Sequence, residues 1–197
     1  MVAIVERNPV STPETGGADT RADVMAEAER VVGKTRRVES YVWATLRLGM
    51  GWIFFWAFID KVFGLGFATA ADKAWLAGGS PTYGFLAFGA KGPFAEMYGA
   101  MAGNVVVDWL FMLGLAYIGT TLLLGLNVKL GAYAGVLMMG LMYTAGFILP
   151  EHNPFLDEHI IFAIILIGLA VTAAGHTMGL GRWWADTPLV RRYPVLE

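Results

Sequence analysis

Apolar residues dominate four stretches of the chain, and polar residues gather in the intervals between them. The four stretches are residues 41–59, 105–126, 130–149 and 159–180. Each is close to the roughly 20 residues with which a helix crosses the roughly 30 Å hydrocarbon core of a bilayer. Residues 41–59 carry one charge and have no polar face, which a surface helix of a soluble domain needs. The pattern therefore predicts four membrane-spanning helices.

The intervals predict how these helices are connected. Residues 127–129 leave room only for a tight turn, so the second and third helices must form an antiparallel hairpin. Residues 62–104 are semi-apolar, rich in aromatic side chains and interrupted by glycine–proline turn signals. We expect this long loop to form short helices that lie in the membrane interface, either as a packed belt or as a lid.

The first forty residues differ from the rest of the chain. Residues 1–19 contain few large apolar side chains, and we expect them to be disordered. Residues 20–38 alternate acids with bases, which predicts a helix exposed to water or to the membrane surface. The predicted fold is all-α: an integral membrane four-helix bundle over residues 41–181, with an N-terminal extension of residues 1–40 and a C-terminal tail of residues 182–197.

Lysine and arginine positions predict the orientation, because cytoplasmic loops of membrane proteins carry an excess of them. Basic residues precede the first predicted helix, lie in the 127–129 turn and follow the fourth helix, whereas residues 150–158 contain none. These residues are Lys34, Arg36, Arg37, Lys129, Arg182, Arg191 and Arg192. We therefore expect a multi-pass protein of the cell membrane with both termini in the cytoplasm.

The amino-acid composition also indicates a membrane protein, and it argues against nucleic-acid binding and several redox cofactors. Charged residues make up 15% of the chain, whereas about 25% is usual in soluble proteins. The net charge of −2 and the lack of a basic patch argue against nucleic acid as a partner. The chain has no cysteine, which excludes disulfides and iron–sulfur clusters, and no flavin fingerprint is present.

Histidine positions argue against haem. His159 and His176 are about 25 Å apart by helical rise on one predicted helix, so they cannot share an iron. His152, His159 and nearby carboxylates are suitable metal ligands by type, but their spacing is loose, and no metal site is predicted.

Polar residues from different helices end on the outer side in this orientation. They are Asp60, Lys61, Asp108, Trp109, Glu151, His152, Asp157, Glu158 and His159. We expect them to converge on one polar site near the outer membrane surface. Taken singly, each has a structural explanation: Lys61 can extend its ammonium to the head groups, and acids can complement a helix N-terminus. Asp108 lies inside an apolar stretch and should pair with Lys61 or with a histidine.

Arg47 poses a separate problem, because an ionised side chain inside a bilayer costs several kcal/mol without a partner. Asp60 is about 20 Å further along the same helix and cannot reach it. A neutral His176 at similar depth is one predicted partner, and lipid phosphates are the other.

Several segments resemble the DoxX/DoxD family of four-span membrane proteins. They are LRLGMGWIFFWAFIDKVFG, GGSPT with GPFA, EHNPFLDEHI and GLGRWWADTPLVRRYP. The resemblance covers residues 47–194 and leaves out the first forty residues. It implies an integral membrane subunit of a quinone-linked oxidoreductase of the thiosulfate:quinone oxidoreductase type, in which electrons pass from a small sulfur compound to membrane quinone.

Under this interpretation the outer polar residues receive roles in quinone chemistry. The predicted catalytic residues are Lys61, Asp108, Asp157 and His159, as proton donors and relays. The predicted quinone-binding residues are Trp56, Asp60, Trp109 and His152. Because nothing in the chain carries electrons, they must come from bound substrate or from a partner subunit.

The absence of redox groups also favours an alternative. In that reading the chain is a non-catalytic assembly or stabilising subunit of a larger, respiratory-type membrane complex. A small-solute or lipid carrier is less well supported, since no predicted helix is broken by proline near the midplane.

Overall fold

The computed structural model describes residues 16–146 and 155–196, and every regular element in these ranges is a helix. The chain divides into two compact units, Met1–Glu39 and Ser40–Glu197. Helix α1, Gly16–Phe63, contributes to both units, which are described separately below.

In the first unit, α1 is a solvated helix. Residues 21–39 are all exposed, and Arg30 and Glu27 form a surface ion pair at 3.9 Å. Residues 20–38, for which a helix was predicted, lie within α1, which continues without a break into the first apolar stretch. Its start at Gly16 shows that residues 16–19, which we expected to be disordered, are helical, while residues 1–15 lie outside the described part of the chain.

The second unit contains the apolar helices. They are the later part of α1, α3 (Val105–Leu124), α4 (Val128–Ala145) and α5 (Glu158–Val171). By length and apolar composition, α1, α3 and α4 are able to cross a membrane. The hairpin between α3 and α4 is as tight as predicted: Gly125 and Asn127 take positive φ angles of 71° and 51° to reverse the chain.

Helix α5 is shorter than the sequence indicated. The apolar stretch predicts a helix to residue 180, but α5 ends at Val171, and Ala173 adopts a left-handed conformation with φ 41°. Between Val171 and residue 180 the chain forms only the short helix η5, Ala174–His176. The break has a physical reason, because the carbonyls of Ala174 and Met178 accept hydrogen bonds from the Arg47 side chain.

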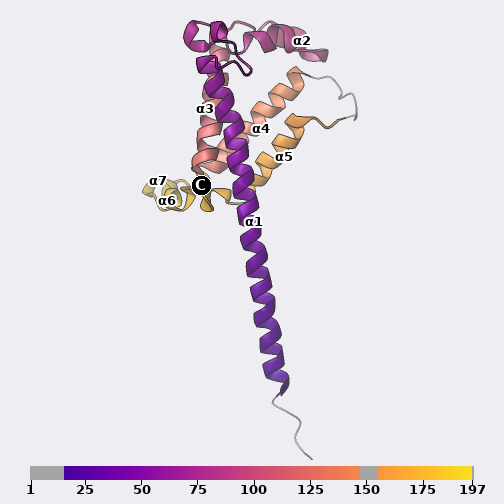
Figure 1. Ribbon diagram of the computed structural model, residues 1–197, viewed down its shortest axis with the longest axis vertical. Helices are drawn as coiled ribbons and strands as arrows, with labels where there is room; N and C mark the ends of the chain where they lie inside the picture. Colours follow the sequence, from indigo (N-terminus) through magenta and orange to yellow (C-terminus); the bar gives the residue numbers. More distant parts are fainter. Residues whose placement is uncertain (1–15, 147–154, 197) are drawn as a thin grey trace, which may run out of the picture. The chain divides into compact units, whose positions relative to one another are not determined.

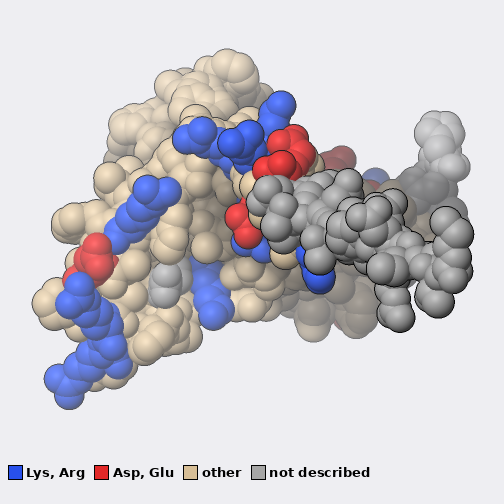
Figure 2. Space-filling model, turned by 90° about the horizontal axis from the view of Figure 1, so that it is seen from below, with Lys and Arg blue, Asp and Glu red and all other residues tan. Residues whose placement is uncertain are grey.

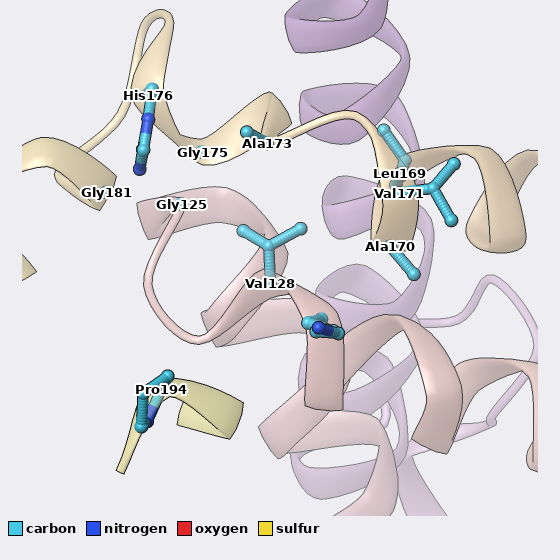
Figure 3. A pocket seen from close by; sticks show the side chains of 11 residues that line it. Gly125, Val128, Leu169, Ala170, Val171, Ala173, Gly175, His176, Gly181 and Pro194 are labelled. Atoms are coloured by element: carbon cyan, nitrogen blue, oxygen red, sulfur yellow. The ribbon is translucent and has the colours of Figure 1, made fainter. Parts of the chain in front are cut away.

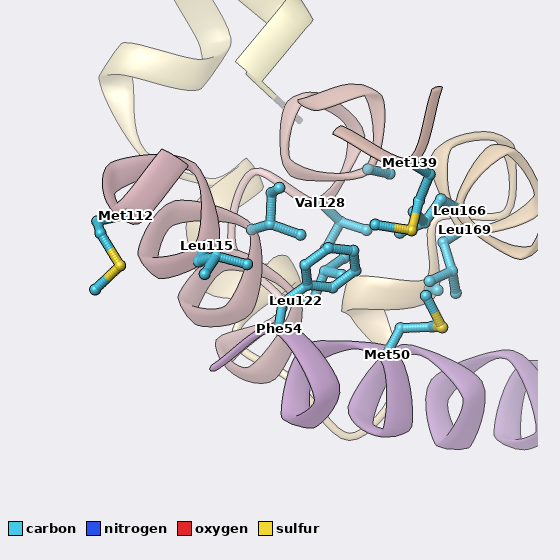
Figure 4. Packing of buried hydrophobic residues seen from close by; sticks show 12 residues of the cluster. Met50, Phe54, Met112, Leu115, Leu122, Val128, Met139, Leu166 and Leu169 are labelled. Carbon is cyan, nitrogen blue, oxygen red and sulfur yellow. The ribbon is translucent and has the colours of Figure 1, made fainter. Parts of the chain in front are cut away.

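The four helices share one core. Met50 and Phe54 of α1 pack against side chains of α3, α4 and α5 (Figure 4). Glycine lets the backbones approach: a Cβ added at Gly119 of α3 would lie 2.6 Å from the backbone nitrogen of Phe55. Small residues at such crossings are typical of membrane helix packing.

Short helices occupy the two ends of this unit (Figure 1). At one end are η1 (Ala71–Lys73), η2 (Trp75–Ala77), η3 (Phe85–Gly89), η4 (Gly92–Phe94) and α2 (Ala95–Gly99). At the other end are α6 (Gly181–Ala185), α7 (Pro188–Arg192) and η6 (Pro194–Leu196). The short helices predicted in residues 62–104 are confirmed, and their position in a membrane interface stays a prediction. The C-terminal tail is also folded, since Trp184 Nε1 donates to the carbonyl of Leu196 at 2.7 Å.

Candidate functional site

A cavity of about 530 Å³ lies between α3 and α4, next to the short helices of residues 80–101. We call residues 80–101 the roof segment. The lining is almost entirely apolar and comprises Lys61, Pro81, Thr82, Phe85, Leu86, Tyr98, Met101, Val107, Leu110, Phe111, Gly114, Ile118, Ala134, Leu137, Met138, Leu141, Met142 and Ala145. Leu110, Leu137 and Leu141 are each more than half exposed, so the cavity opens sideways between the two helices.

Lys61 is the one charged side chain among the described residues of this lining. It is half-buried near the end of α1, and the described part of the chain gives it no ion pair. The cavity therefore combines an apolar interior with one lysine side chain in its wall.

Asp108 holds the roof segment to α3. Its side chain is 6% exposed, and its Oδ1 accepts hydrogen bonds from Ser80 Oγ at 2.9 Å and from the Thr82 hydroxyl and backbone N–H at 2.5 and 3.1 Å. The expectation that Asp108 pairs with Lys61 or a histidine is wrong. Residues 80–82 of the loop lie over the start of α3, so their hydroxyl and N–H groups are the donors that bind the carboxylate.

The roof segment is also anchored to α4. The hydroxyls of Tyr98 and Thr144 are hydrogen-bonded at 2.7 Å, and the backbone N–H of Lys91 donates to the carbonyl of Ala145 at 2.8 Å. Together with Asp108, these contacts fix the cavity wall to both helices that enclose it.

Asp60 has a local structural role. It is 1% exposed, and its two carboxylate oxygens accept the backbone N–H groups of Phe67 and Ala68 at 3.2 and 3.0 Å. These bonds close the loop that follows α1. Asp60 does not line the cavity.

Asp157 and His159 form a separate pair at the start of α5. Asp157 accepts the backbone N–H of Ile160 at 3.1 Å as the helix cap, and its other oxygen lies 2.8 Å from His159 Nδ1. Burial raises the pKa of Asp157, but the hydrogen bonds from His159 and Ile160 outweigh it and hold the pKa below its usual value. No hydrogen bond or ion pair within residues 16–146 and 155–196 joins this pair to Asp60 or Asp108.

The tryptophans that we predicted to form the walls of the quinone site pack against other tryptophans instead. Trp56 stacks on Trp52 with ring centroids 5.5 Å apart, and Trp109 meets Trp75 edge-on at 4.6 Å. Neither Trp56 nor Trp109 lines the cavity. His152 and Glu151 lie outside the described residues.

Sequence reasoning missed the aromatic residues that do form the wall. They are Phe85, Tyr98 and Phe111. The unusual density of aromatic residues in the long loop was the available signal for the first two, whereas Phe111 is indistinguishable from its apolar neighbours in α3.

Arg47 binds backbone carbonyls, which the sequence analysis did not predict as its partners. The side chain is fully buried. Its Nε donates to Ala174 at 3.2 Å and its Nη2 to Met178 at 2.7 Å, with Thr177 at 3.4 Å. Its Nη1 donates to the carbonyls of Leu122 and Leu123.

These bonds join the end of α3 to the turn that follows α5. The last carbonyls of any helix have no partner within it, so a guanidinium with several donors is well suited to bind them. Glycines give it space: Cβ atoms added at Gly125 and Gly179 would lie 3.2 and 3.0 Å from its nitrogens. Gly175 and Gly179 both lie in this turn, between the end of α5 and the start of α6.

The described residues contain no group of three or more His, Cys, Asp or Glu side chains that could hold a metal ion. No family model, curated protein or solved structure matches the chain. The resemblance to DoxX/DoxD proteins therefore rests on the sequence segments alone, and function has to be inferred from the cavity between α3 and α4.

Proposed function

We propose that this chain is an integral membrane four-helix protein that binds membrane quinone in the α3–α4 cavity, as a subunit of a DoxX/DoxD-type quinone-linked oxidoreductase. The observation that carries the proposal is the cavity itself, which is apolar, opens sideways between α3 and α4 and has Lys61 as the one charged residue among its described lining residues.

The exposed surface supports a bilayer environment. Large apolar side chains such as Leu110, Leu113 and Leu137 are more than half exposed on α3 and α4, which would be costly in water over so wide an area. In a bilayer the same surface faces lipid tails. A mouth between Leu110, Leu137 and Leu141 would then admit a ligand directly from the hydrocarbon.

A quinone matches the chemistry of this lining. Its isoprenoid tail suits the leucine and methionine side chains of α3 and α4, and its ring suits aromatic walls such as Phe85 and Phe111. Its ring carbonyls need hydrogen-bond donors, which Lys61 supplies and the Thr82 hydroxyl does not, because that hydroxyl donates to Asp108. Lys61 is therefore the residue to which we assign contact with the quinone.

Of the residues predicted to be catalytic, only Lys61 is assigned a direct part in the reaction. Reduction of a quinone to a quinol takes up two electrons and two protons. We assign Lys61 to one carbonyl, to which it delivers one proton, while the second proton and the proton that restores Lys61 come from the aqueous phase. Asp108 acts as a positioning residue through the roof segment. The electrons must come from a reduced donor bound nearby, which the family resemblance suggests is thiosulfate, or from a partner subunit.

A specific observation also favours the assembly-subunit alternative. Asp108, which we expected to relay protons, and Asp60, which we expected to bind quinone, both have oxygens that accept hydrogen bonds from loop residues. A chain that only binds quinone for stability, or that only supports a catalytic partner, would need no proton relay.

Quinone binding by the purified full chain in detergent tests the proposal. We expect a water-soluble quinone analogue to quench tryptophan fluorescence saturably. Lys61→Gln should weaken binding about tenfold, because it removes the charged donor, and Ala134→Phe should abolish it by filling the cavity. Lys73→Gln is the matched control, since Lys73 is an exposed lysine outside the lining.

Absence of saturable quenching, or equal affinity in Lys61→Gln and wild type, would reject the cavity as a quinone site. Addition of thiosulfate separates the two functions. Reduction of the bound analogue supports the oxidoreductase, whereas binding without reduction supports the assembly role or a requirement for a partner subunit.

A further inference from the structure

A second cavity, of about 210 Å³, lies at the opposite end of the four-helix unit (Figure 3). It is enclosed by the end of α3, the start of α4 and the turn after α5. Its polar lining includes Lys129 and His176 together with the backbone at Gly125, Gly175 and Gly181. It is separate from the α3–α4 cavity, with which it shares no lining residue.

Positive charge prevails at this end. The described residues at the start of α4 and in the chain after α5 include the cations Lys129, Arg182, Arg191 and Arg192, against one carboxylate, Asp186. Asp186 is engaged by Arg191 at 3.3 Å. Figure 2 looks onto this side of the molecule and shows Lys and Arg side chains along its edge.

Arg47 adds a buried charge behind the same wall. Its guanidinium would be 3.2 Å from a Cβ at Gly125, a residue of the cavity lining, and each of its hydrogen bonds in the described structure goes to a neutral carbonyl. Carbonyls orient the guanidinium but do not cancel its charge. The cavity therefore lies next to a cation that is bonded to no carboxylate among the described residues.

The other side of the lining is apolar. Leu169, Ala170 and Val171 at the end of α5 contribute to it, and Val171 is 71% exposed. The neighbouring helices α6 and α7 carry exposed Trp183 and are followed by exposed Tyr193. Trp and Tyr are enriched where a membrane protein meets the head groups.

We propose that this cavity binds the phosphate group of an anionic phospholipid. The Lys129 ammonium contacts the phosphate beside the closely packed backbone at Gly125, Gly175 and Gly181. The acyl chains leave along the apolar end of α5. Basic pockets between membrane helices are suited to anionic head groups, and an apolar wall beside the charge favours a lipid over free inorganic phosphate.

Lipid retention by the full chain in detergent tests this site. Native mass spectrometry with phosphatidylglycerol and phosphatidylcholine should show selective retention of the anionic lipid. Lys129→Gln should lower that retention about fivefold, the effect of one lysine near an anionic surface. Lys129→Arg should restore it because the charge is kept, and Lys73→Gln, at an exposed lysine of the other end, should leave it unchanged.

Three results would overturn the proposal. They are equal retention of the two lipids, unchanged phosphatidylglycerol retention in Lys129→Gln, and displacement of the lipid by millimolar inorganic phosphate, which would identify the ligand as a free anion. Circular dichroism of each variant shows that it is folded. Quinone binding should be the same in Lys129→Gln and wild type. The lipid site and the quinone site are therefore tested independently of each other.

Discussion

Replacing Arg47 by methionine removes the only side chain that joins the end of α3 to the turn after α5 through charge-assisted hydrogen bonds in the described structure. Methionine keeps much of the buried volume but leaves the carbonyls of Leu122, Leu123, Ala174 and Met178 without the donor that they have in the native protein. We expect a large loss of stability that comes from hydrogen bonding and not from a cavity.

The magnitude follows from the number of bonds. A buried carbonyl left unsatisfied costs about 1–3 kcal/mol, so four of them set an upper range of about 4–12 kcal/mol. Removal of the cation offsets part of this, because burying a guanidinium costs several kcal/mol. The expected net loss in the free energy of unfolding is about 3–5 kcal/mol, the range seen when one partner of a buried charged network is deleted.

Thermal unfolding in detergent, followed by tryptophan fluorescence, measures this effect. A loss of about 3–5 kcal/mol corresponds to a fall in Tm of about 6–20 °C for a chain of this size. Arg37→Met is the matched control, since Arg37 is exposed on α1 and should change stability by less than about 0.5 kcal/mol. If Arg47→Met unfolds within about 1 kcal/mol of the wild type, the arginine does not hold these segments together.

Three further predictions concern other contacts of the fold. Asp108→Ala should release the roof segment, costing about 2–4 kcal/mol locally, which amide hydrogen exchange would show as faster exchange there while the rest of α3 stays protected. Gly119→Ala should destabilise the unit by about 1–3 kcal/mol, because its Cβ would meet the α1 backbone at 2.6 Å, whereas Gly140→Ala, with nothing within 4 Å, should be neutral or stabilise by about 0.5–1 kcal/mol; equal Tm values would contradict the crossing. Because the pKa of Asp157 is lowered on folding, its contribution to the start of α5 is present above its unfolded pKa and is lost as the pH falls through its folded pKa; exchange at this helix start should accelerate in acid, and Asp157→Asn should remove that acid step.

The apolar stretches determined the helical class of the protein. Inside a bilayer, a single apolar segment satisfies all its backbone hydrogen bonds internally only as a helix. Three of the four apolar runs form helices long enough to cross a bilayer. The tight α3–α4 connection was equally determined, because residues 127–129 cannot make any longer excursion.

Tertiary structure decided where polar side chains find partners. Asp108 was expected to meet a charged group, but the roof segment places Ser80 and Thr82 within hydrogen-bonding distance, and their hydroxyls carry no periodic signal in the sequence. Such contacts join residues far apart in the chain, so no local pattern encodes them.

The end of α5 is also a feature that the apolar pattern of the sequence does not predict. Apolar residues continue past Val171, and sequence alone extends the helix to residue 180. The Arg47 guanidinium, contributed by a different helix, takes the carbonyls of Ala174 and Met178, and the glycines of the turn let it approach. Hydrophobicity set which segments are helical, whereas long-range hydrogen bonds to one buried cation set where the last of them stops.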